Sequence, residues 1–152
     1  MNNNETAIDV SVIVNSKLGE LRDDVERDID SIEEWINRLI LQPEKAVRNT
    51  DCRCEICLSK EERSNLEEHH IAGRKHDYRT VLTCIRCHRI LSDKQKVWDR
   101  QWLITNQSSS KRNGFFLLGL YDLLILKAER TSNNLYRLLA NKLIETISLL
   151  LG

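Results

Sequence analysis

Hydrophobic residues recur at steps of three or four along several stretches of the chain, a spacing that places them on one face of a helix. The first stretch runs from about residue 16 to residue 41, and acidic residues fill many of the positions between its apolar ones. Pro43 follows and predicts the end of this helix, because proline interrupts helical hydrogen bonding. Residues 115–129 and 132–151 are two further apolar segments separated by the sequence TSNN, and we expect a helix in each.

The middle of the chain has a different pattern. Residues 66–71 and 79–83 are short enough for strands, and Gly73 and its polar neighbours supply a loop between them. A helix is expected over residues 90–103, with Trp98 and Trp102 on its core side. The chain as a whole is therefore predicted to be α+β and mostly helical, with a small strand-containing core between N-terminal and C-terminal helices.

These patterns divide the chain into four parts. Residues 1–47 comprise a loose arm, up to about residue 15, and the first amphipathic helix. Residues 48–105 form a central domain, and residues 106–114, NQSSSKRNG, have the composition of a linker. Residues 115–152 form a C-terminal helical segment. The apolar faces of the terminal helices are typical of a core, a helical bundle, or a seam with a second copy or a partner helix.

Charge is unevenly distributed, although the formal net charge of the chain is zero. Residues 1–47 carry 5 basic against 11 acidic side chains, whereas residues 48–112 carry 14 against 9. The middle of the chain is therefore the part suited to a polyanion such as nucleic acid. The longest apolar run, 115–126, is shorter than the roughly 20 residues that a membrane-spanning helix needs. With no secretory signal at the N-terminus, we expect a cytoplasmic protein without a membrane partner.

All five cysteines and all four histidines lie within residues 52–88. Four of the cysteines form two CxxC pairs, which we call the first knuckle (residues 54–57, CEIC) and the second knuckle (residues 84–87, CIRC). Two such pairs can present four thiolates tetrahedrally to one Zn²⁺, and in a reducing compartment metal binding is favoured over disulfides. We therefore predict a structural zinc site, and Cys52 falls outside it. The predicted ligands are Cys54, Cys57, Cys84 and Cys87.

Three histidines add a second signal. His69 and His70 lie next to each other in a predicted strand, so their imidazoles point to opposite faces. His88 follows the second knuckle, where the chain is expected to enter a helix. A hairpin carrying the first two and a helix carrying the third can converge on a single ion, which favours a functional role over three unrelated surface histidines.

Residues 54–95 resemble an HNH endonuclease domain of the zinc-ribbon type. The resemblance is carried by CEIC and by EEHHIAGRKHDYRTVLTCIRCHRILSDKQ, in which the knuckles, HHI and CH occur in the family's order. It implies a ββα-metal fold in which a catalytic divalent ion is separate from the structural zinc. By position it implies that His69 and His88 are ligands of the catalytic ion and that His70 is the general base.

The resemblance also implies the chemistry, which is hydrolysis of phosphodiester bonds in DNA, expected to be double-stranded. His70 would take a proton from water, and the ion, Mg²⁺, Mn²⁺, Ni²⁺ or Zn²⁺, would neutralise charge on the phosphate. Basic side chains near the predicted site are suited to contacts with DNA phosphates. These side chains are Arg74, Lys75, Arg86 and Arg89.

One position departs from the family. Its middle Asn, which orients the general base, falls here on Arg79 or Thr80, and neither is Asn. His76 or Asp77 could substitute from the loop, and the Thr80 hydroxyl could support the loop less strongly. Two other functions remain open from the sequence. One is a non-catalytic zinc-ribbon module that binds nucleic acid or a protein. The other is a helical interaction protein in which zinc only holds the middle of the chain together.

Overall fold

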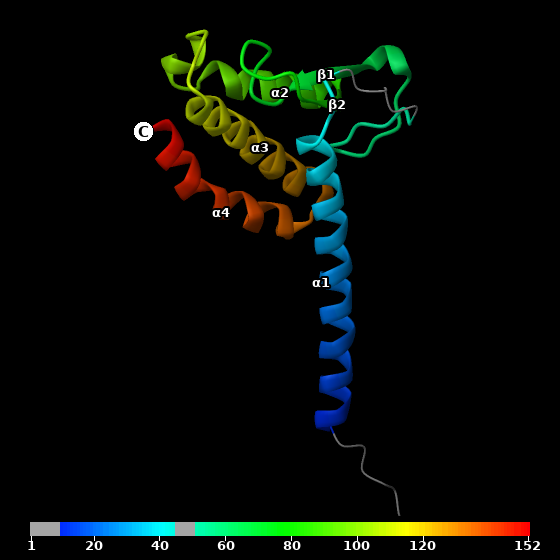
Figure 1. The fold of residues 1–152 in the computed structure, drawn as a ribbon. Helices are drawn as coiled ribbons and strands as arrows, with labels where there is room; N and C mark the ends of the chain where they lie inside the picture. Colours follow the sequence, from blue (N-terminus) through cyan, green and yellow to red (C-terminus); the bar gives the residue numbers. More distant parts are fainter. Residues whose placement is uncertain (1–9, 45–50) are drawn as a thin grey trace, which may run out of the picture. The chain divides into compact units, whose positions relative to one another are not determined.

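The computed structural model describes residues 10–44 and 51–152, and it contains four α-helices and a two-stranded antiparallel sheet in that part of the chain (Figure 1). This confirms the predicted mostly helical α+β class. Two short 3₁₀ turns, Arg63–Asn65 and Arg100–Leu103, lie on either side of the sheet and its helix in the sequence. The longer elements are α1 (Val10–Ile40), β1 (Leu66–His70), β2 (Thr80–Cys84), α2 (Ile85–Lys96), α3 (Ser109–Thr131) and α4 (Asn134–Leu151).

The described residues divide into two units, one ending at Ile36 and the other beginning at Asn37. In the first unit α1 is already helical at Val10, so the predicted loose arm is wrong for residues 10–15; residues 1–9 lie outside the described part. Valine and isoleucine lower helix propensity by only a fraction of a kcal/mol each, which does not stop a helix of this length. Leu18 and Leu21 are exposed on α1.

The second unit is built around a ββα motif. β1 and β2 pair so that Leu66 lies opposite Cys84 and His70 lies opposite Thr80. α2 begins directly after β2, because the Cys84 sulfur caps it by accepting the backbone N–H of Cys87. The ends of both strands lie within one residue of their predicted positions. The predicted helix at 90–103 is misplaced, since α2 begins at residue 85 and ends at residue 96.

The edge of β2 that faces away from β1 is closed by two side chains from outside the sheet. The Gln42 amide accepts the N–H of Thr80 and donates to its carbonyl oxygen, at 3.1 and 2.6 Å. Two residues along, Leu82 donates its N–H to the Glu55 carboxylate and accepts the Glu55 N–H. These contacts satisfy backbone N–H and C=O groups at the edge of β2 that would otherwise be able to pair with another strand.

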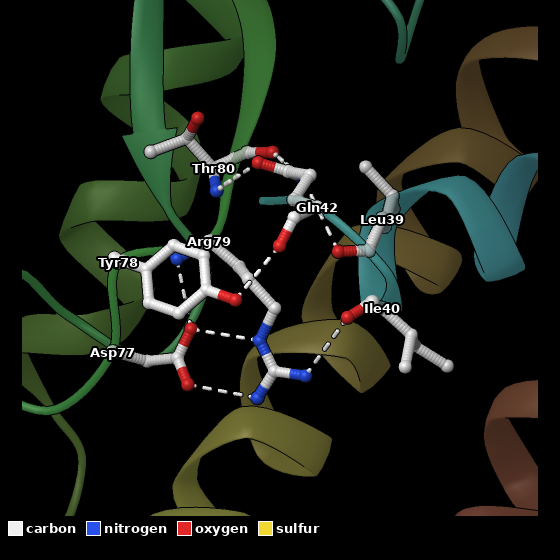
Figure 2. A network of polar contacts seen from close by, with 7 residues as sticks. All are labelled: Leu39, Ile40, Gln42, Asp77, Tyr78, Arg79 and Thr80. Carbon is white, nitrogen blue, oxygen red and sulfur yellow. Dashed lines mark hydrogen bonds and ion pairs between the residues drawn. The ribbon is translucent and has the colours of Figure 1, made fainter. Parts of the chain in front are cut away.

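The last turn of α1, which belongs to the second unit, is held by the same region (Figure 2). Arg79 donates to the carbonyl oxygen of Ile40, and Tyr78 donates to that of Gln42. Both oxygens of Asp77 accept hydrogen bonds from the Arg79 guanidinium at 2.8 Å, which fixes the direction of its planar group. The positive charge of Arg79 at the C-terminus of α1 also interacts favourably with the helix dipole.

This network explains where the units divide. The sequence places a boundary at residues 47/48, which falls in the segment 45–50 outside the described residues. The described residues divide at 36/37. The reason is that the end of α1 is hydrogen-bonded through Gln42 and Arg79 to the strand and loop that follow the first knuckle.

α3 lies between α2 and α4 in the second unit (Figure 1). The predicted linker at 106–114 is therefore wrong for residues 109–114, which form the start of α3. Ser108 caps this helix by accepting the N–H of Lys111. Gly114 lets α4 approach, because a Cβ at this position would lie 2.6 Å from a methyl carbon of Leu151. Residues typical of linkers here serve as a cap and a packing site.

The closest approach of α3 to the sheet occurs at Gly119. A Cβ built on Gly119 would lie 1.8 Å from the carbonyl oxygen of Ile71, the residue that directly follows β1. Any side chain at this position would force the helix away from the hairpin. Residues 115–152, predicted as a separate segment, are therefore part of the same compact unit as the ββα motif.

Trp98 and Trp102, predicted to lie in the core, are half-buried beside this contact. The Trp98 indole N–H donates to Asp122 on α3 at 3.0 Å, and that of Trp102 donates to the carbonyl oxygen of Ala72 at 2.9 Å. Burial raises the pKa of Asp122, and the hydrogen bond from Trp98 opposes that shift. Phe115 stacks on Trp98. Among the described residues, no helix has the length and apolar content needed to cross a bilayer.

We predict that Gly119→Ala destabilises the second unit by about 1–3 kcal/mol, because the new methyl group must displace the backbone of Ile71. The measurement is urea unfolding followed by tryptophan fluorescence, since Trp98 and Trp102 lie in this unit. Gly19→Ala on α1 is the matched control: nothing lies within 4 Å of a Cβ there, so the helix should become about 0.5–1 kcal/mol more stable. Equal stability of Gly119→Ala and wild type would contradict the close approach.

Candidate metal centre

The sulfur atoms of Cys54, Cys57, Cys84 and Cys87 lie within 4.8 Å of one another. Within residues 10–44 and 51–152 they form the only group of three or more Cys, His, Asp or Glu side chains so close together. The sulfurs of Cys57 and Cys84 are 3.8 Å apart. Tetrahedral coordination with Zn–S distances of 2.3 Å requires sulfurs about 3.8 Å apart. The four side chains therefore fit a structural metal ion such as zinc, as the sequence predicts.

The two knuckles have the same local geometry although they begin in different elements. In each, the N–H of the second cysteine points at the sulfur of the first, at 3.5 Å, from Cys57 to Cys54 and from Cys87 to Cys84. The first knuckle lies at the end of a short antiparallel bridge between Arg53 and Lys60. The second knuckle is the junction of β2 and α2. Donors aimed at a sulfur favour its thiolate form, the form that binds metal.

Protonation of the cluster is strongly uneven. A hydrogen bond from Cys87 lowers the pKa of Cys54 to about 4, against the effect of burial. The same hydrogen bond, together with burial, raises the pKa of Cys87, and burial raises that of Cys84. Metal binding must displace the protons held by these raised groups, so metal affinity should increase with pH.

Glu55, inside the first knuckle, connects the cluster to the sheet. Its N–H donates to the carbonyl oxygen of Leu82 at 2.8 Å, and its carboxylate accepts the Leu82 N–H at 2.7 Å. The second carboxylate oxygen pairs with Arg38 at 3.3 Å. These bonds align the first knuckle with β2, which ends in the second knuckle. The sequence shows no sign of this role, because it depends on contacts 17 and 27 residues away.

His69 and His88, the predicted ligands of a second ion, are brought together. Their ring centroids are 5.4 Å apart in an edge-to-face arrangement, one on β1 and one on α2. His69 is 4% exposed, and burial lowers its pKa to about 4, so its imidazole is neutral at pH 7. Among the described residues, no third Cys, His, Asp or Glu side chain lies close enough to these two rings to complete a group.

Glu67 is a functional candidate that the sequence analysis does not identify. Its carboxylate lies 2.9 Å from Nδ1 of His88. This contact leaves Nε2 of His88 as the nitrogen able to bind an ion, and a carboxylate on the other ring nitrogen is the usual support of a metal-binding histidine. The sequence signal that could identify Glu67 is the period of two in a strand. Glu67 and His69 lie two residues apart and therefore share a face of β1.

Gln95 of α2 was also missed. Its amide nitrogen donates to the carbonyl oxygens of His70 and Ile71, at 2.9 and 3.2 Å. The same nitrogen lies 3.3 Å from Nε2 of His69. An amide has two protons, and the two carbonyls take them, so the contact with His69 is the weakest of the three. Gln95 thus holds the end of β1 against α2.

His70, the predicted general base, is half-buried at the end of β1. Burial lowers its pKa, and the charge of Arg74 lowers it further, while Glu68 and Asp77 oppose the shift. Arg74 is therefore near enough to act on His70 electrostatically. Lys75, Arg86 and Arg89 are exposed, and their contact with DNA stays a prediction.

Neither loop residue considered as a replacement for the family's Asn is available to hold His70. His76 is buried in the core, where it contacts the carbonyl oxygen of Trp102 at 2.5 Å and stacks on Phe115. Asp77 is engaged with Arg79, as Figure 2 shows. Asp77 influences the charge of His70 without a hydrogen bond between them among the described contacts.

Comparison of the chain with protein-family models, curated proteins and solved structures gave no match. The geometry of the four cysteines and the three histidines therefore carries the functional argument.

We predict that protein prepared without added metal contains about one zinc ion per chain, because thiolate sites couple metal binding to folding. Cys84→Ser should lose the ion and the order of the hairpin, because Cys84 is both a ligand and the cap of α2. Cys52→Ser is the matched control and should keep the ion. Elemental analysis together with far-UV circular dichroism measures both effects. Soluble, folded wild-type protein without metal would contradict the assignment.

Proposed function

We propose that the chain is a metal-dependent endonuclease that hydrolyses phosphodiester bonds in double-stranded DNA. The observation that carries the proposal is the meeting of His69 and His88 between β1 and α2, with His70 directly after His69 in β1. A ββα motif closed by four cysteines and carrying three histidines in this order supports the resemblance to zinc-ribbon HNH endonucleases. In this proposal zinc occupies the four-cysteine site and has a structural role.

The protonation states support these roles. The lowered pKa values of His69 and His70 keep both imidazoles neutral at pH 7, as a metal ligand and a general base respectively require. Glu67 orients His88 through Nδ1, so that Nε2 can face the same ion as His69. A divalent ion bound there, Mg²⁺, Mn²⁺, Ni²⁺ or Zn²⁺, would neutralise charge on the phosphate and stabilise the leaving oxygen.

The chain's own residues supply the remaining steps. His70 accepts a proton from a water molecule as that water attacks phosphorus. Arg74, which lies close to His70, grips the phosphate, and Lys75, Arg86 and Arg89 hold the DNA backbone on either side. Such contacts position DNA without reading its sequence, so the proposal implies weak sequence preference from these residues.

One observation favours a second function, a non-catalytic zinc-ribbon module that binds nucleic acid or a protein. At the position of the family's middle Asn, Arg79 is engaged in other contacts, and Thr80 offers only a hydroxyl in place of the amide that supports the general base in the family. Arg79 is paired with Asp77 and packs over the ring of Phe116 at 3.8 Å. Thr80 is bound through its backbone to Gln42. Without such support the general base would be poorly oriented, and binding could be the whole function.

We predict that His70→Ala lowers the rate of plasmid nicking roughly 10²–10⁴-fold, because proton abstraction is lost. Nicking is measured with Mg²⁺, Mn²⁺, Ni²⁺ and Zn²⁺ in turn, beside DNA affinity and zinc content, which should not change. Asn65→Ala is the control, since Asn65 is exposed and directly precedes the same strand.

Two results would decide between the proposed functions. Nicking by His70→Ala at the wild-type rate would remove His70 from the mechanism. DNA binding by wild-type protein without nicking in any of the four ions would reject the nuclease and support the binding module.

A further inference from the structure

Lys127 of α3 is a buried cation beside the first knuckle. It is 5% exposed, and lysine is rarely buried to this extent without a compensating negative charge. Its ammonium donates a hydrogen bond to the backbone carbonyl oxygen of Glu55, between Cys54 and Cys57. The ring of Tyr136 on α4 lies 5.4 Å from the ammonium nitrogen. The sequence gives no sign of this contact, which spans 72 residues.

The partners that surround Lys127 offset only part of the cost of burying its charge. Burial lowers the pKa of Lys127 to about 8, while the negative charges of Glu55 and Cys54 oppose that shift and Arg38 adds to it. The Glu55 carboxylate is shared with Arg38 and with the N–H of Leu82. The other negative charge that acts on Lys127 is that of Cys54, a member of the cysteine cluster.

A four-thiolate metal site also buries a net charge, and that charge is negative whereas the charge of Lys127 is positive. A divalent ion with four thiolates carries two net negative charges, and Cys54, Cys84 and Cys87 are all buried. A buried net charge is costly unless an opposite charge lies nearby. Lys127 supplies a positive charge on the inner side of the first knuckle, where solvent is excluded.

We propose that Lys127 is a positioning residue of the metal centre, and that its ammonium, held on the Glu55 carbonyl, offsets the negative charge of the tetrathiolate. The inference rests on the assignment of a metal ion to the four cysteines. It explains why α3 carries a buried lysine, and it makes metal binding depend on the docking of α3 as well as on the knuckles.

The test replaces the charge while keeping the length and burial of the side chain. In Lys127→Met, zinc affinity measured by competition with a chromophoric chelator should fall about 10–100-fold, the usual effect of losing a residue that supports metal ligands. Lys127→Gln, which can still donate to the Glu55 carbonyl, should also bind zinc more weakly, because the charge is absent. Arg130→Met is the matched control: it removes an exposed cation from the same helix and should leave affinity unchanged.

A second readout separates charge compensation from simple packing. The melting temperature of each variant is measured with zinc and with excess chelator. Methionine is cheaper to bury than lysine, so Lys127→Met should lose stability only in the zinc-bound form. Equal zinc affinity of Lys127→Met and wild type, or equal losses of stability in both forms, would overturn the inference. Failure of the wild type itself to bind zinc would instead overturn the metal assignment on which it rests.

Discussion

The convergence of four cysteine sulfurs from two separate knuckles is the constraint on which the second unit depends. The first knuckle is an irregular segment with no strand or helix of its own, and the second is the junction of β2 and α2. A two-stranded hairpin is marginal in water by itself. Joining the knuckles at one point fixes the strands relative to the helix, and Glu55 extends the effect by bonding the first knuckle to Leu82.

The histidine arrangement follows from that constraint. β1 is paired in register with β2, so fixing the end of β2 at Cys84 also fixes where His69 lies. His88 comes one residue after the second knuckle, in the first turn of α2. The distance between the two rings is thus set by the cysteines, and Glu67 fixes the orientation of the His88 ring. α3 then holds the hairpin from the other direction, through the close approach of Gly119 to Ile71.

The features predictable from sequence are those encoded by short-range spacing. The CxxC pairs predicted the four-cysteine cluster, and the short length of the two segments with the Gly73 loop between them predicted both strands. The start of α2 was missed because its cap is a cysteine sulfur rather than a serine or aspartate oxygen. The linker prediction was wrong at residues 109–114 because serine and glycine are common in turns and also serve as helix caps and sites of close packing. Here Ser108 is a cap and Gly114 is a packing site. The roles of Glu55, Gln95 and Lys127 could not be predicted from the sequence, because each acts through partners more than 15 residues away.

The central claim, that metal bound by the four cysteines orders the hairpin and the start of α2, is tested most directly by amide hydrogen exchange with and without a chelator. The account predicts that removal of the metal, verified by elemental analysis, abolishes the protection of the amides in Thr80–Cys84 and in the first turn of α2. The protection of the amides in α4 should change much less. Unchanged protection of β2 after the metal has been removed would contradict the account, because the sheet would then be held by its other contacts alone.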